Sequence, residues 1–345
     1  MKKIMILIVL ANLLIIGLAA NISAAKEVYN LKAFYFGPET ASFTKNRWYP
    51  YLDAIENASE GKIKFTRMHG FSVLPPSKIY DGLARGIVDL AYVPVAFTPG
   101  RFLRTEMLML PGLARNRLVG GQIVNDLIET HVYKDFPELA NVVFDYSGPR
   151  TLWMAKKPIR TLEDLKGLRI RAYHEQKKTA LTAVGAVFTA TPAPERFMAM
   201  ERGLLDGSIE VSTSAEPFGL QELLRYQVDM NFGSVITVIG FCKKTFEKFS
   251  PDLQIKLAKV NRKFAIDYFA EQAKKEDEQL LNEEWPKKYG LKTIKLPDEE
   301  KEKWEKIINP IWDQWAAKLE SKGLEGNEIL SEIIRGQKKY GETPK

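Results

Sequence analysis

Cysteine and histidine are rare in this chain of 345 residues, which contains one cysteine, Cys242, and three histidines. A single cysteine cannot form an intramolecular disulfide, so burial of a core has to hold the folded chain together. The histidines, His69, His131 and His174, are far apart and lack partners at the spacing of metal ligands. No glycine-rich phosphate-binding motif and no G-x-S-x-G motif occurs. The sequence therefore gives no positive sign of catalysis, of a metal site or of a cofactor.

Two further candidates for chemistry have simpler explanations. Cys242 lies in the apolar segment VIGFCKK (238–244), which predicts a packed side chain; the neighbouring lysines keep a reactive thiol as the alternative. The adjacent carboxylates of Glu163 and Asp164 precede a predicted helix, where N-terminal capping explains them.

Long apolar runs are absent except at the N-terminus. Residues 1–25 begin with Lys2 and Lys3, continue with an apolar stretch and end with Ser23 and Ala25 at the −3 and −1 positions. This pattern predicts a secretory signal peptide cleaved after about Ala25, with an uncleaved N-terminal anchor as the alternative. We therefore expect a soluble, periplasmic mature protein.

The excess of one charge sign is only mild, which fits a soluble protein with a somewhat basic surface. The formal net charge is +7, which removal of Lys2 and Lys3 lowers by two, and acidic and basic residues are interspersed along the chain. No basic motif occurs, so we do not expect nucleic acid as a partner.

Strand and helix patterns alternate in two series, which predicts an α/β fold with two lobes and mainly parallel sheets. From Pro251 onward the sequence is helical and highly charged, with amphipathic stripes. The predicted strands are 28–36, 62–69 and 87–95 in the first series, and 141–148, 151–158, 167–173 and 186–192 in the second.

The segments YDGLARGIVDLA (80–91) and FMAMERGLLDGS (197–208) repeat one pattern: a helix, Arg-Gly, two branched apolar residues and an aspartate. Gly86 and Gly203 suit the left-handed position that ends a helix. The repeat predicts lobes of similar design, with binding residues just past each aspartate, at the carboxyl ends of strands. These are Tyr92, Pro94, Val95 and Phe97 in the first lobe and Ile209, Glu210 and Val211 in the second.

The stretch DLKGLRIRAYHE (164–175) places Arg169 and Arg171 on one face of a predicted strand. Arg171 has apolar neighbours, so its guanidinium needs an anionic partner inside a cleft. A ligand carboxylate matches the planar fork of arginine. An internal acid, such as Glu210 or Asp206, is the alternative, and the residues alone leave both open.

The blocks RTLEDLKGLRIRAYHE (160–175) and ALTAVGAVFTATPAPERFMAMERGLLDG (180–207) resemble the signature of solute-binding proteins of TRAP (tripartite ATP-independent periplasmic) transporters, DctP type. LMLPGL (108–113) and FSPDLQIKL (249–257) fit the same pattern, so the resemblance covers essentially the whole mature chain. It implies a two-lobed periplasmic-binding-protein fold, class II-like, with hinge-crossing segments and long C-terminal helices. The expected parts are lobe I (26–147 and about 238–260), lobe II (148–237) and C-terminal helices packing across both lobes (261–345).

The resemblance also assigns residues to a binding site. Arg171 occupies the position of the family arginine that binds the substrate carboxylate, and Arg150 resembles a second family arginine. Glu210 stands where members that bind sialic acid have an asparagine, and Ala193 stands where they have a pocket phenylalanine. The remaining expected pocket residues are Phe36, Pro94, Val95, Phe97, Trp153 and Tyr173.

An apolar and aromatic first lobe disfavours sialic acid and C4-dicarboxylates as ligands. We expect a monocarboxylate with an apolar or aromatic body, or a zwitterion if the ammonium group meets Glu210. If Glu210 instead pairs with Arg150 or Arg171, it gives no information about the charge of the ligand. The implied partners are TRAP membrane subunits, and we expect a monomer that carries out no chemistry. The alternatives are a binding module for a signalling receptor and an exported enzyme on the same fold.

Overall fold

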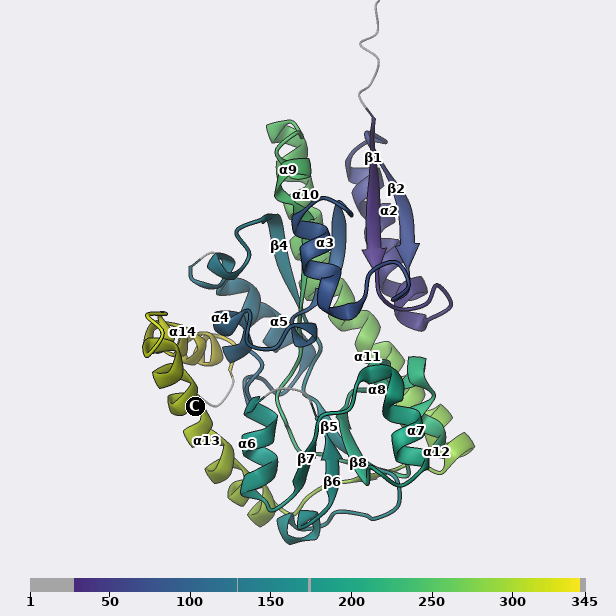
Figure 1. Ribbon diagram of the computed structural model, residues 1–345, viewed down its shortest axis with the longest axis vertical. Coiled ribbons are helices and arrows are strands. Elements are labelled where there is room, and N and C mark those ends of the chain that lie inside the picture. The colour runs from purple at the N-terminus through teal and green to yellow at the C-terminus, as the bar shows by residue number, and fades with distance from the viewer. Residues whose placement is uncertain (1–27, 129, 173–174, 342–345) are drawn as a thin grey trace, which may run out of the picture.

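Two β-sheets, one in each of two α/β lobes, organise the chain (Figure 1). The computed structural model describes residues 28–341, except residues 129, 173 and 174. The predicted signal peptide (1–25) and Tyr173 lie outside the described residues. Within the described part of the chain, no helix combines the length and the apolar character needed to cross a membrane.

Lobe I contains a five-stranded sheet with the order β2-β1-β3-β10-β4. β1 is parallel to β2 and β3, whereas β10 is antiparallel to β3 and β4. The strands are β1 (Tyr29–Tyr35), β2 (Ile63–His69), β3 (Leu90–Pro94), β4 (Leu139–Tyr146) and β10 (Ile236–Cys242). The helices and helical turns are η1 (Thr44–Trp48), α2 (Tyr49–Ala58), η2 (Pro76–Lys78), α3 (Ile79–Ala84), η3 (Val95–Phe97), α4 (Leu103–Met107), α5 (Arg117–Asp126) and η4 (Val132–Asp135).

Lobe II contains a six-stranded sheet with the order β11-β9-β5-β8-β6-β7. β6 is parallel to β7 and β8, whereas β5 is antiparallel to β8 and β9. The strands are β5 (Thr151–Met154), β6 (Arg169–Arg171), β7 (Val187–Thr189), β8 (Gly207–Glu210), β9 (Tyr226–Val228) and β11 (Lys292–Ile294). The helices and helical turns are η5 (Leu162–Leu165), α6 (Glu175–Ala183), η6 (Ala193–Glu195), α7 (Arg196–Glu201), α8 (Ser212–Ala215), η7 (Glu216–Phe218) and η8 (Leu220–Glu222).

Each predicted strand overlaps an observed one, although β4 starts two residues before the predicted 141–148, but the expected mainly parallel pairing is wrong in the middle of both sheets. β10 enters lobe I from lobe II, and β5 enters lobe II from lobe I. Each of these strands therefore runs against its neighbours. The sheets are mixed because β5 and β10 each enter their sheet from the other lobe.

The two connections between the lobes lie side by side. Residues 147–150 join β4 to β5, and residues 229–235 join β9 to β10. The backbone N–H of Arg150 donates to the carbonyl of Gly233 at 2.7 Å, and the N–H of Phe232 donates to the carbonyl of Arg150 at 2.9 Å. We call this place, where residues 147–150 and 229–235 run side by side, the hinge. Arg150 is thus held by main-chain hydrogen bonds at the hinge.

The sequence repeat has the same structure in both lobes. Gly86 and Gly203 follow α3 and α7 with φ angles of 76° and 68°, which confirms the predicted left-handed helix ends. Paired hydrogen bonds of the Schellman type close both ends. Asp89 and Asp206 then each accept, at 2.8 Å, the backbone N–H of a residue on the neighbouring strand. The aspartates therefore hold neighbouring strands of each sheet together and do not reach the cleft.

The chain ends in long helices that contact both lobes (Figure 1). In α13, Trp312 donates to the carbonyl of Pro111 in lobe I at 2.9 Å, and Glu300 accepts the N–H of Leu162 in lobe II at 2.6 Å. The elements are α9 (Lys243–Phe246), α10 (Pro251–Lys263), η9 (Phe264–Tyr268), α11 (Phe269–Gln279), η10 (Leu280–Glu284), α12 (Trp285–Tyr289), α13 (Asp298–Glu320) and α14 (Gly326–Lys339).

Candidate functional site

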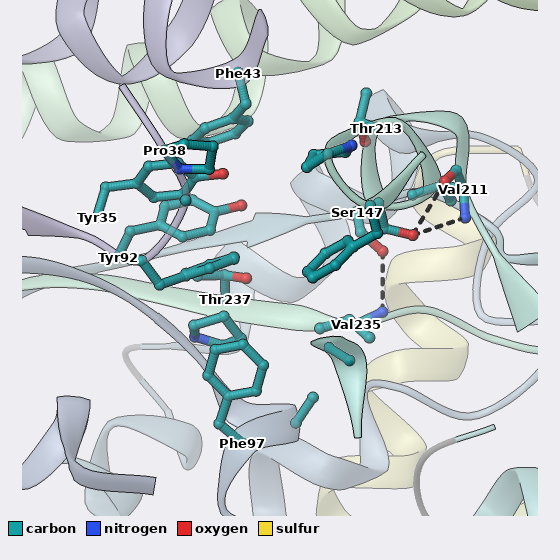
Figure 2. A pocket seen from close by; sticks show the side chains of 18 of the residues that line it. Tyr35, Pro38, Phe43, Tyr92, Phe97, Ser147, Val211, Thr213, Val235 and Thr237 are labelled. Atoms are coloured by element: carbon teal, nitrogen blue, oxygen red, sulfur yellow. Dashed lines mark hydrogen bonds between the residues drawn. The ribbon is translucent and has the colours of Figure 1, made fainter. Parts of the chain in front are cut away.

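A cavity of about 370 Å³ lies between the lobes, next to the hinge. Figure 2 shows Tyr35, Tyr92 and Phe97 of lobe I on one side, facing Val211 and Thr213 of lobe II across the space. The lobe I residues come from, or directly follow, the carboxyl ends of strands β1 and β3. This is the edge at which open α/β sheets bind ligands.

The lobe I side of the cavity is an aromatic wall, made of Tyr35, Phe36, Phe43, Phe71, Tyr92 and Phe97. Phe36 and Phe71 are stacked, with ring centroids 5.6 Å apart and an interplanar angle of 11°. Phe97 meets Phe36 edge-on, with centroids 5.2 Å apart. Rings in these arrangements attract one another and form a surface suited to a flat apolar group.

Three polar side chains at this wall, Tyr92, Arg117 and Arg47, already have internal partners. The Tyr92 hydroxyl donates to the buried carboxylate of Asp145, which also accepts from Arg117 at 2.6 Å. Burial, reinforced by Asp145, raises the pKa of Tyr92 well above its usual value, so the phenol stays neutral. Arg47 likewise forms an ion pair, with Glu276 of α11. Arg47 and Arg117 line the cavity but have internal counterions.

The opposite side is built around the buried carboxylate of Glu210 at the end of β8. Its Oε1 accepts from Arg171 Nη1 at 2.9 Å and from Arg196 Nη1 at 2.6 Å. Its Oε2 lies 3.4 Å from Arg150 Nη1. Burial opposes ionisation of Glu210, but the guanidinium groups of Arg196, Arg171 and Arg150 outweigh it and lower its pKa to about 2. Three arginines thus share one carboxylate.

The three arginines differ in how they face the cavity. Arg171 is fully buried and does not line it. Arg196 lines it, but its three side-chain nitrogens donate to Ala193, Glu210 and Ser214.

Arg150 also lines the cavity, and it uses only Nη1, toward Glu210 and Ser214. Its Nε also lacks a partner among the described residues but is buried. Nη2 makes no hydrogen bond to the described residues and is not buried, so it is the donor left for a ligand.

Lys177 adds a fourth buried cation near this cluster. Its Nζ donates to the carbonyl of Ser234, in the second connection, at 3.0 Å. Burial, together with Arg150 and Arg171, lowers the pKa of Lys177 to about 7, although Glu210 opposes the change. The charge of Lys177 therefore depends on the neighbouring Arg150, Arg171 and Glu210.

The structure brings only part of the residue set expected from the sequence to the cavity wall. Phe36, Pro94, Phe97 and Arg150 line it, whereas Arg171, Glu210, Val95 and Trp153 do not. Val95 is buried in the core of lobe I. Trp153 packs edge-on against Trp285 in lobe II and donates to the backbone carbonyl of Glu210 at 3.0 Å.

The alternative of an internal partner for Arg171 is the one observed, and the partner is Glu210 rather than Asp206. Asp206 forms a two-point ion pair with Arg169 instead, at 2.9 Å for both contacts. Because Glu210 is enclosed by guanidinium groups, it cannot serve as the partner of a ligand ammonium group.

Sequence reasoning missed Arg196, Phe71 and Phe218. Arg196 begins α7, where the helix dipole disfavours a cation, and this placement was a usable signal of an anion nearby. Its guanidinium stacks on Phe218, 4.2 Å from the ring centroid. Phe71 lies in a loop after β2 whose course no periodicity predicts. Among the described residues, no group of three or more metal-ligating side chains is placed to hold a metal ion.

Comparison with known proteins agrees with this architecture. The chain is 24% identical to a solute-binding protein of Albidiferax ferrireducens over 279 residues, which cover 77% of this chain and 79% of the relative. Its fold is similar to that of a TRAP solute-binding protein from Rhodoferax ferrireducens in complex with copurified benzoate, with a TM-score of 0.80 and 19% identity, covering 91% of this chain and 99% of the other.

A TRAP solute-binding protein from a marine metagenome, described as specific for aromatic acid ligands and co-crystallised with 3-hydroxybenzoate, has a TM-score of 0.81 at 19% identity, with the same coverage. The family model of the bacterial extracellular solute-binding proteins, family 7 (DctP), matches residues 43–319.

Proposed function

The chain belongs to family 7 of the bacterial extracellular solute-binding proteins, which serve TRAP transporters, and we propose that it captures a monocarboxylate with an aromatic or otherwise apolar body. Members of this family bind small organic acids and work with TRAP membrane subunits; they are substrate-binding proteins and not enzymes. The proposal concerns the kind of acid.

The observation that carries the proposal is the division of the cavity into two unlike halves. Arg150 offers a free guanidinium donor, Nη2, on one side, while the stacked rings of Phe36 and Phe71 lie on the other. A ligand that satisfies both halves has a carboxylate at one end and a flat apolar group at the other.

The charge around Glu210 supports an anionic ligand. Arg150, Arg171 and Arg196 carry three positive charges, and Glu210 supplies one negative charge. The buried cluster is therefore left with excess positive charge, which a carboxylate in the cavity would offset. A neutral ligand would leave the Arg150 guanidinium partly unpaired.

The bound molecules of similar proteins point in the same direction. Benzoate and 3-hydroxybenzoate, named for the two TRAP proteins above, are monocarboxylates with aromatic rings. Benzoate is accordingly our first test compound for this chain.

Isothermal titration of the mature protein with benzoate and with the neutral benzamide tests the proposal. We expect benzoate to bind and benzamide to bind at least about tenfold more weakly, because only the carboxylate can accept charge-assisted hydrogen bonds from Arg150. Arg150→Gln should weaken benzoate binding by about 2 kcal/mol, roughly thirtyfold. The matched control is Arg169→Gln, since Arg169 pairs with Asp206 away from the cavity. Equal binding of benzoate and benzamide would refute the proposal.

A further inference from the structure

The Glu210 carboxylate occupies a position that resembles the binding site of a ligand anion. We propose that Glu210 acts as a built-in carboxylate, which fills an anion site directly behind the cavity wall and restricts the cavity to ligands with a single carboxylate. This inference rests on the proposed function, because it concerns which acids the Arg150 site accepts.

The contacts of Glu210 are those of a fully bound carboxylate. Besides the arginines, Ser208 Oγ donates to Oε1 and Ser214 Oγ donates to Oε2, each at 2.6 Å. Two oxygens with about four lone-pair sites thus receive five donors. No acceptor capacity remains for a ligand, and the side chain has no exposed surface.

This anion site is continuous with the cavity. Arg150, Arg196 and Ser214 donate to Glu210 and also line the cavity. One layer of side chains therefore separates the Glu210 carboxylate from the ligand space. Without the glutamate side chain, the same donors would face an anion entering from the cavity.

The donors that Glu210 occupies supply the physical reason for selectivity. With Glu210 present, donors of Arg171, Arg196, Ser208 and Ser214 already hold a carboxylate, so a second ligand carboxylate finds this anion site filled. Without this internal anion, the buried guanidinium groups would lack a counterion, which is strongly unfavourable. A ligand with a second carboxylate could then replace the lost charge.

A second acid in the same lobe provides a matched control. Asp206 also forms an ion pair with an arginine of β6, Arg169, but the two side chains are 30% and 43% exposed. They do not line the cavity. Removing the Asp206 charge changes the net charge of the lobe by the same amount as removing the Glu210 charge, but it leaves the anion site intact.

The test compares benzoate with isophthalate, which adds a second carboxylate to the same ring, by titration calorimetry at neutral pH. We expect the wild-type protein to prefer benzoate at least about tenfold, and Glu210→Gln to lower this preference by about tenfold or more. Asp206→Asn should keep the wild-type preference. An unchanged preference in folded Glu210→Gln would overturn the inference.

Glu210→Ala purified in formate provides a second measurement if Glu210→Gln does not fold. Formate should raise the melting temperature of this variant and leave that of the wild type unchanged, and isophthalate should compete with the formate. A formate response equal to that of the wild type would refute the built-in carboxylate. Failure of the wild type to bind any monocarboxylate would instead refute the proposed function, so the two failures are distinguishable.

Discussion

Gly233 lies where the second connection between the lobes passes the backbone of residues 109–111. Its φ angle is +81°, and a Cβ atom built on it would lie 2.1 Å from the carbonyl oxygen of Met109. The same glycine accepts the backbone N–H of Arg150 at 2.7 Å. We predict that Gly233→Ala destabilises the protein and weakens ligand binding together.

The loss of stability expected for Gly233→Ala has two separate causes. An alanine at positive φ costs roughly 1–2 kcal/mol, because the left-handed conformation crowds Cβ. The contact with Met109 adds an overpacking cost of about 1–3 kcal/mol, since backbone on both sides has to move. The expected loss in the free energy of unfolding is therefore about 2–5 kcal/mol.

Gly203→Ala is the matched control for Gly233→Ala. Gly203 has a φ angle of +68°, and no atom lies within 4 Å of its built Cβ. This variant should show the backbone cost alone, about 1–2 kcal/mol, and bind benzoate normally.

Urea unfolding followed by tryptophan fluorescence measures the free energy of unfolding of both variants, because Trp304 packs on Phe232 beside the hinge and reports on this region. Equal losses of stability in Gly233→Ala and Gly203→Ala would refute the close backbone approach. A Gly233→Ala protein that binds benzoate like the wild type would refute the link between this glycine and Arg150.

Three other predictions concern the ligand. Benzoate binding at pH 7 should take up about half a proton, because a bound anion raises the pKa of Lys177 from about 7. The affinity for benzoate should therefore rise as the pH falls through 7. Calorimetry in buffers of different ionisation enthalpy measures the proton uptake, which should be absent in Lys177→Met. Phe71→Leu should weaken benzoate by about 1 kcal/mol and cyclohexanecarboxylate by less, and equal losses would contradict the aromatic wall. Ser42 of lobe I donates to Glu216 of lobe II at 3.1 Å, so Ser42→Ala should weaken every ligand by about 1 kcal/mol without changing their order, as titration calorimetry can check.

The helix ends and the paired aspartates were predictable because they follow local rules. Gly86 and Gly203 end helices in a conformation that few other residues adopt, and the pattern around them reveals it within a dozen residues. Asp89 and Asp206 occupy the expected place after each glycine, where each accepts a backbone N–H and a side-chain donor, from Thr245 and Arg169 respectively.

The roles of the arginines could not be predicted in the same way. Strand alternation correctly places Arg169 and Arg171 on one face, and each one indeed finds an acid on the segment 206–210. Which arginine reaches the cavity depends on contacts between residues far apart in the sequence. Arg150 and Glu210, for example, are 60 positions apart, and no local periodicity encodes their pairing.

We expect Arg150 to couple the capture of an acid to closure of the lobes. Its backbone is hydrogen-bonded to Phe232 and Gly233, so the ligand-facing guanidinium lies on the hinge itself, where movement between the lobes is smallest. The aromatic wall, in contrast, belongs to lobe I and moves with it. We expect a carboxylate to bind first to the fixed donors of Arg150, and the wall to close over the ring afterwards. The affinity for the carboxylate should then depend little on the wall, and discrimination between apolar bodies should depend on it strongly.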